Sequence, residues 1–252
     1  MGLFTGEHAL VTGSASNIGR AIAVALAREG ASVVLADVDQ ARNGAVAAEI
    51  AADGGNAQVH RADLSTHDGW RPLLALAVSG RLDMLVHSAS PLRREVDHAM
   101  AVDEATWDAM VNTNVRSGFF LAQGIGADMK RRGVRGRMLF ITSLHAESPR
   151  NLPHYSASKA GQTMVVRELA RALGPSGIRV NALAPGAVPG GGFNAAGMDF
   201  SGKIPMGRPG RAEDMAGPAL ALLSDRFSAY VTGTTLAVDG GLALFNWIPF
   251  SP

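Results

Sequence analysis

The chain has 252 residues, a formal net charge of +1 and no cysteine. Hydrophobic residues make up 47% of it and charged residues 18%, which is typical of a globular protein. The small net charge argues against a nucleic-acid or membrane partner that binds through bulk charge, and the lack of cysteine excludes disulfides and thiolate zinc sites. The seven histidines show no paired ligand spacing, so no metal site is expected. We find no signal peptide and no apolar run of the roughly 20 residues that span a bilayer, and we expect a cytoplasmic protein.

Short apolar runs alternate along the chain with longer segments of helical periodicity. Seven strands separated by helices indicate right-handed βαβ crossovers and a parallel sheet covered on both faces. We therefore predict an α/β fold, with one Rossmann-type, doubly wound domain over residues 1–252 and about seven parallel strands. The predicted strands are 8–12, 32–37, 57–63, 82–90, 136–143, 178–186 and 234–241, and the predicted helical segments are 17–30, 41–53, 69–78, 103–132 and 155–173.

Two segments stand apart from this pattern. Residues 185–209 are rich in glycine and proline and include three consecutive glycines, 190–192, which suits a flap over a site. The C-terminal segment 242–252 is unusually apolar for a free tail.

The first predicted strand leads into the first helix through "VTGSASNIGRA". A tight glycine turn here would let backbone N–H groups and the helix N-terminus meet a pyrophosphate. The spacing Gly13-x-x-x-Asn17-x-Gly19 is not the G-x-G-x-x-G fingerprint, so a plain tight turn is the alternative.

Asp37 closes the second predicted strand, where a carboxylate can accept hydrogen bonds from the ribose hydroxyls of a dinucleotide. The same charge would repel a 2′-phosphate, and neither Ser16 nor Val38 supplies a cation to neutralise one. Arg42, further along, is interpreted as a solvated helix residue. The sequence thus predicts NAD rather than NADP.

Asp63 follows the third predicted strand in "RADLS". Its carboxylate could bond the adenine edge. Alternatively it caps the next helix, a role for which Ser65 competes.

Tyr155 and Lys159 form a rare pair in a chain with two tyrosines and three lysines. At i and i+4 of a helix they project from one face. A free phenol has a pKa near 10, and a nearby ammonium favours the phenolate that a general base requires. An exposed pair without function is the alternative. Ser143 follows the preceding strand and could bond the reacting oxygen, or could simply be a helix cap.

Taken together, these motifs resemble the short-chain dehydrogenase/reductase family over essentially the whole chain. The matching elements are the glycine turn, "AD" at Asp37, "RADLS", "NTNV" at 112–115, Ser143, "YSASK" and "NALAPG". The resemblance implies that Ser143, Tyr155 and Lys159 are catalytic, that Asn114 holds a water of a proton relay, and that Lys159 also bonds the nicotinamide ribose. The cofactor residues that it implies are Gly13, Ser16, Asn17, Ile18, Gly19, Asp37, Asp63, Leu64, Ala89, Tyr155, Lys159, Pro185, Gly186 and Val188.

Two departures from the family pattern concern the cofactor end. Asn17 stands where glycine is usual, and because Asn tolerates left-handed backbone we expect the turn to survive. The usual Asn-Asn-Ala-Gly is replaced by His87-Ser88-Ala89-Ser90. Ala89 fits, Ser90 adds bulk near the cofactor, and His87 is interpreted as a packed histidine rather than a catalytic one.

The loops expected around the pocket are polar and have few aromatic residues. They suit a polyol, sugar or sugar acid, and we expect Arg93, His145, Arg150, Asn151 and His154 to contact the substrate. An arginine here could bind a carboxylate, or be merely solvated.

The sequence leaves three further expectations. A 3-oxoacyl-thioester reductase and a non-catalytic NAD-binding sensor are the alternative functions. The family resemblance implies a homo-oligomer, which we expect to be a tetramer. In that assembly we expect the apolar tail to bury Trp247 and Phe250 at a subunit interface.

Overall fold

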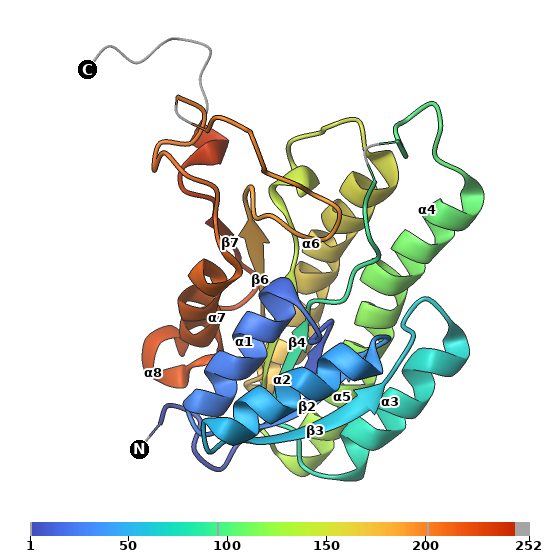
Figure 1. Cartoon of the computed structure of the whole chain (residues 1–252). Helices are drawn as coiled ribbons and strands as arrows, with labels where there is room; N and C mark the ends of the chain where they lie inside the picture. Colours follow the sequence, from blue (N-terminus) through green and yellow to red (C-terminus); the bar gives the residue numbers. More distant parts are fainter. Residues whose placement is uncertain (1, 95, 201, 245–252) are drawn as a thin grey trace.

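A single sheet of seven parallel strands forms the centre of the molecule (Figure 1). The structure is a computed structural model that describes residues 2–94, 96–200 and 202–244. The strand order is β3-β2-β1-β4-β5-β6-β7, which confirms the predicted fold class. The strands are β1 His8–Thr12, β2 Ser32–Asp37, β3 Asn56–Arg61, β4 Met84–His87, β5 Arg137–Ile141, β6 Arg179–Pro185 and β7 Thr235–Val238.

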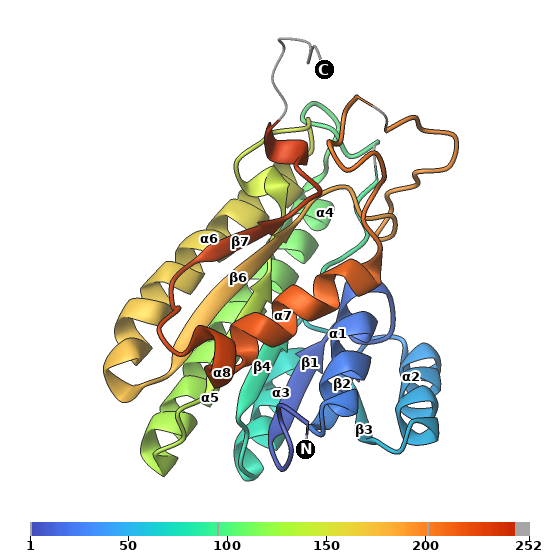
Figure 2. The ribbon, with the colours of Figure 1, turned by 90° about the vertical axis from the view of Figure 1, so that its left-hand side faces the viewer.

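Helices cover both faces of the sheet, each over its own hydrophobic cluster (Figures 1 and 2). Helices α1, α2 and α7 pack on one face, and α3, α5 and α6 on the other. Strands buried from both sides are mostly apolar: every residue of β4 and β5 is buried, and only His87 and Arg137, at the strand ends, are polar. The helices are α1 Asn17–Arg28, α2 Gln40–Ala52, α3 His67–Ser79, α4 Glu104–Val111, α5 Gly118–Arg132, α6 Pro153–Leu173, α7 Ala216–Leu223 and α8 Asp225–Ser228.

The helix predicted over 103–132 contains a π-helical turn. Residues Asn112–Ser117 connect α4 to α5, and the residues at both junctions have right-handed helical backbone. Hydrophobic periodicity does not reveal such a turn, because one extra residue hardly alters the apolar stripe. Helices α7 and α8 also had no predicted bounds.

The order of the strands reverses between β1 and β4, which are neighbours in the sheet but not in the chain. In such folds the ligand site lies beyond the carboxyl ends of the strands at this switch point. The loops after β1, β4, β5 and β6 meet there, and the irregular segment 185–209 follows β6 at the same edge (Figure 1).

Two predictions remain open at the level of the fold. Residues 185–209 have an irregular backbone, and their role as a flap stays a prediction. Trp247 and Phe250 lie outside the described residues, so their predicted burial stays a prediction. None of the described helices is long and apolar enough to cross a membrane.

Candidate active site

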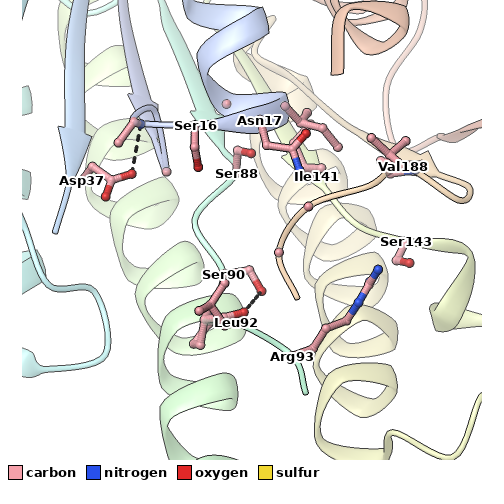
Figure 3. Close-up of a pocket in the computed structure, with 18 of the residues that line it drawn as sticks. Ser16, Asn17, Asp37, Ser88, Ser90, Leu92, Arg93, Ile141, Ser143 and Val188 are labelled. Carbon is pink, nitrogen blue, oxygen red and sulfur yellow. Dashed lines mark hydrogen bonds between the residues drawn. The ribbon is translucent and has the colours of Figure 1, made fainter. Parts of the chain in front are cut away.

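A cavity of about 420 Å³ at the carboxyl edge joins the predicted nucleotide turn to the predicted catalytic residues (Figure 3). Asp37 lies at one end of it, and Tyr155 and Lys159 at the other. The predicted residues that line it are Gly13, Ser16, Asn17, Ile18, Gly19, Asp37, Arg93, Ser143, Tyr155, Lys159, Pro185, Gly186 and Val188.

A second cavity of about 270 Å³ adjoins the first and shares Gly13 and Asp37 with it. The remaining predicted cofactor residues line it: Asp63, Leu64 and Ala89.

Neither Asp63 nor Ser65 caps the following helix, α3. Thr66 caps α3, and its hydroxyl accepts from the Gly69 N–H at 3.1 Å. The Asp63 carboxylate instead accepts from the backbone and hydroxyl of Ser65, at 3.0 and 2.7 Å.

The glycine turn after β1 is tight and brings its backbone close to the loop after β4. Gly13 has a left-handed φ of +68°, and a Cβ there would lie 2.7 Å from the backbone of Ala89. A Cβ on Gly19 would lie 2.0 Å from the Gly13 carbonyl oxygen. Ser16 is the N-cap residue of α1, but its hydroxyl accepts no hydrogen bond from the helix. The first N–H groups of α1 are therefore available to bind an anion. This cradle fits the pyrophosphate of a dinucleotide.

Asn17 adopts the left-handed backbone expected of it, with a φ of +49°. Its amide donates to the Pro189 carbonyl at 3.1 Å and so ties the glycine turn to segment 185–209. The turn therefore forms without the usual glycine.

The Asp37 carboxylate is held by two backbone N–H groups, those of Ala15 and Asp39, each at 3.0 Å. These bonds orient the carboxylate at the edge of the cavity. Arg42 also lines this cavity, and its guanidinium pairs with Asp39 at 3.3 Å. Its interpretation as a merely solvated residue was therefore incomplete.

Lys159 is buried, with 2% of its surface exposed, yet it borders the cavity. Its Nζ donates to the Ile141 carbonyl at 2.8 Å and to Gln162 Oε1 at 3.1 Å. A protonated amine has three N–H groups, so one is left for a ligand. Burial, with a smaller contribution from the positive charge of Arg93, lowers the pKa of Lys159 to about 7.

The ring of Tyr155 is surrounded by three basic side chains. The Arg93 guanidinium carbon lies 4.9 Å from the ring centroid and Lys159 Nζ 5.5 Å from it, while His145 packs edge-on at 5.1 Å. Ser143 follows β5 and accepts from the His145 backbone N–H at 3.2 Å. Tyr155 and Lys159 thus meet in one cavity, which excludes the alternative of an exposed pair.

Asn114 does not line either cavity; it is fully buried in the π-helical turn. Its side-chain amide donates to Ser158 Oγ at 2.9 Å, and its backbone carbonyl accepts from Gln162 Nε2 at 2.8 Å. Gln162 therefore joins Lys159 to Asn114. Gln162 was not among the predicted site residues, although its spacing of three residues from Lys159 places both on one helix face.

His87 is fully buried and bonded through both ring nitrogens. Nδ1 lies 3.1 Å from Thr12 Oγ1, and Nε2 lies 3.2 Å from the Thr113 carbonyl. Burial lowers its pKa to about 4, with a smaller contribution from Lys159, so the ring is neutral at pH 7. A neutral ring must donate from Nε2 to the carbonyl and accept at Nδ1 from the hydroxyl. This geometry agrees with a packed histidine that supports the π-helical turn.

The five residues expected to contact the substrate separate in space. Arg93 lines the cavity and His145 packs on Tyr155. Arg150 and Asn151 are exposed and His154 is fully buried, and none of these three lines the cavity. Among the described residues, no cluster of three or more His, Asp or Glu side chains could hold a metal ion.

Comparisons with known proteins agree with this site. A family model described as "Enoyl-(Acyl carrier protein) reductase" matches residues 13–243. The L-rhamnose 1-dehydrogenase (NAD(P)(+)) of Azotobacter vinelandii is 36% identical, over 95% of this chain and 98% of that protein. A 3-oxoacyl-[acyl-carrier-protein] reductase of Synechocystis sp. is 34% identical, over 97% of this chain and all of that protein.

A crystal structure from Beutenbergia cavernae, assigned as an NAD(P) dependent gluconate 5-dehydrogenase with bound NADP at low occupancy, has the same architecture. It superimposes with a TM-score of 0.87 at 36% identity and covers 96% of this chain and 98% of that one. The chain belongs to the short-chain dehydrogenase/reductase family.

Proposed function

We propose that the protein oxidises a secondary alcohol, a polyol, sugar or sugar acid, with NAD⁺ as hydride acceptor and Tyr155 as general base. One observation carries the proposal. A single cavity holds Tyr155, Lys159 and Ser143 at one end, and Asp37 and the glycine turn at the other.

The chain's own residues handle the proton and the substrate oxygen. When bound, NAD⁺ supplies the acceptor for the hydride that leaves the carbinol carbon. Tyr155 takes the hydroxyl proton, so the alcohol loses one hydride and one proton and becomes a carbonyl. The Ser143 hydroxyl donates to the substrate oxygen. The remaining N–H of Lys159 is available to the nicotinamide ribose, and its positive charge favours a phenolate nearby.

The preference for NAD rests on Asp37. Its carboxylate is fixed at the cavity edge, where it can accept from ribose hydroxyls and repels a 2′-phosphate. The cation nearest in sequence, Arg42, is partly neutralised by Asp39. Related proteins are named for NAD(P) or contain NADP, so both cofactors must be assayed.

Sugar substrates are supported by relatives named for rhamnose and gluconate. A 3-oxoacyl-thioester reductase is the second candidate, supported by the Synechocystis relative. A non-catalytic NAD-binding sensor fits less well, because Ser143, Tyr155 and Lys159 all line one cavity. A cytoplasmic location and a tetramer stay predictions.

The decisive experiment compares the wild type with Tyr155→Phe. Polyols, aldoses, sugar acids and 3-oxoacyl thioesters are assayed with both cofactors by absorbance at 340 nm. We expect NAD-linked alcohol oxidation by the wild type and a loss of at least roughly 100-fold in Tyr155→Phe, because the general base is removed. Calorimetry should show unchanged NAD binding in the variant. A nearly unaffected rate would refute the role of Tyr155, and equal kcat/KM with NAD⁺ and NADP⁺ would refute the cofactor preference.

A further inference from the structure

We propose that Arg93 binds a carboxylate of the substrate, so that the proposed dehydrogenase acts on a sugar acid in preference to the corresponding neutral sugar. The inference rests on the proposed function, because it assigns the substrate class of the same cavity.

The guanidinium of Arg93 is held by two aromatic rings. Its central carbon lies 4.9 Å from the centroid of Tyr155 and 5.7 Å from that of Phe193. A cation–π contact uses no hydrogen-bond acceptor, so the N–H groups of the guanidinium stay available to a ligand. Those N–H groups match the two oxygens of a carboxylate.

The backbone around Arg93 is fixed by the glycine run of segment 185–209. The Arg93 N–H donates to the Gly191 carbonyl at 3.1 Å. Gly192, with a φ of +95°, approaches so closely that a Cβ would lie 1.8 Å from the Arg93 carbonyl oxygen. Figure 3 shows that the Arg93 side chain points toward Ser143, across the catalytic end of the cavity.

The charge of Arg93 has no acidic partner within the described part of the chain. The two acidic residues that line the cavity, Asp37 and Asp39, belong to its nucleotide end. Its neighbour Arg94 differs, since it pairs with Asp97 at 3.1 Å. The positive charge of Arg93 also lowers the pKa of both Lys159 and His145. The catalytic end of the cavity is therefore electropositive and suited to an anion.

The position of Arg93 also limits the size of that anion. Since the guanidinium lies over the Tyr155 ring, one molecule can reach both only if its carboxylate and its reacting carbinol are a few carbons apart. Sugar acids satisfy this condition. In a long acyl thioester the reacting carbon lies beside the thioester, and no carboxylate is present to bind Arg93.

The test uses matched pairs of neutral sugar and sugar acid: D-glucose with D-gluconate, D-galactose with D-galactonate, and D-mannose with D-mannonate. Wild type, Arg93→Gln and the control Arg94→Gln are assayed with NAD⁺. We expect the wild type to prefer the acid of at least one pair. Arg93→Gln should lower kcat/KM for that acid roughly 100-fold and lower kcat/KM for the neutral sugar by a clearly smaller factor. Arg94→Gln should leave both unchanged, because Arg94 does not line the cavity and glutamine can still donate to Asp97.

The possible failures are distinguishable. A wild type that oxidises neutral sugars or polyols but prefers no acid overturns the inference and leaves the proposed function intact. An equal loss for acid and sugar in Arg93→Gln overturns it too, since Arg93 would then only support Tyr155. Preference for D-glucose 6-phosphate over D-gluconate would show that Arg93 binds a phosphate rather than a carboxylate, which overturns the inference. Reduction of 3-oxoacyl thioesters without turnover of any sugar, sugar acid or polyol would instead remove the proposed function itself.

Discussion

At the residue scale, the site depends on a buried amine whose surroundings hold it in place. Lys159 Nζ donates to the Ile141 carbonyl and to Gln162 Oε1, and Gln162 in turn donates to the Asn114 carbonyl. The Gln162 side chain thus bridges Lys159 and the backbone carbonyl of Asn114, the residue for which the family resemblance implies a bound water. Its carboxamide orients the amine but carries no readily ionised group.

Changing Gln162 should therefore move the pKa of Lys159 in a predictable direction. Gln162→Leu removes an acceptor of the charged amine and should lower the pKa further below about 7, whereas Gln162→Glu adds a negative charge and should raise it by about 1 unit or more. Because the chain has three lysines, a ¹⁵N NMR titration of lysine side chains can resolve the change. The same pKa in wild type and both variants would show that Gln162 does not set the protonation of Lys159.

The proximity of Tyr155 and Lys159 was predictable because their spacing is local. Tyr155 and Lys159 share a helix face at any orientation of that helix, so i and i+4 suffice. The contacts of His87 with Thr12 and Thr113 join residues 75 and 26 positions apart, and no local spacing encodes them. His154 directly precedes Tyr155 and so points to a different side of α6, where it is fully buried and does not line the cavity.

At the element scale, segment 185–209 positions Arg93 through backbone contacts. Its glycine run was predicted to form a flap, but the sequence did not indicate that one glycine packs directly on the Arg93 carbonyl. Gly192 is confined by this contact, whereas a Cβ on Gly191 would meet nothing within 4 Å. Both glycines have positive φ values, +95° for Gly192 and +60° for Gly191, so alanine has a backbone cost at each position, but a Cβ clashes only at Gly192.

Alanine at these two positions should have different effects on turnover. Gly192→Ala must displace the segment or Arg93, and we expect roughly a 10- to 100-fold loss of kcat/KM for the substrate. Gly191→Ala carries a similar backbone cost of about 1–2 kcal/mol, but its Cβ does not clash with Arg93, so its kcat/KM should stay within a few-fold of the wild-type value. Steady-state kinetics with melting temperatures measure both effects. Equal activity losses would show that backbone strain, rather than the position of Arg93, controls the site.

The elements themselves were predictable wherever periodicity is strong. Buried strands such as β4 and β5 contain short apolar runs, and the glycine turn marks the start of α1. The π-helical turn that buries Asn114 depends instead on contacts from other elements, including the His87 bond to Thr113. A one-dimensional pattern does not contain those contacts.

At the scale of the whole molecule, burial of weak bases links folding to pH. His87 lies in the interior between the sheet and the π-helical turn, and burial holds its folded pKa near 4 against an ordinary value of 6.5. Burial also lowers the pKa of His145 to about 4 and lowers that of His154. The folded molecule excludes protons from all three rings over a range in which the unfolded chain binds them.

The free energy of unfolding should therefore fall as pH decreases from about 6.5 toward 4. In this window the unfolded chain binds a proton at His87 and the folded protein does not, so the stabilisation is complete above pH 6.5 and is lost on approach to pH 4. For His87 alone the difference amounts to roughly 3 kcal/mol. The lowered pKa of Lys159 affects stability in a separate pH range, between about 7 and 10.5.

Urea unfolding of wild type and His87→Gln at pH 7, 6 and 5 measures the effect of His87. Glutamine can keep a donor toward Thr113 and an acceptor toward Thr12, so the variant should lose less stability per pH unit than the wild type. Parallel pH curves would instead show that other groups control acid unfolding.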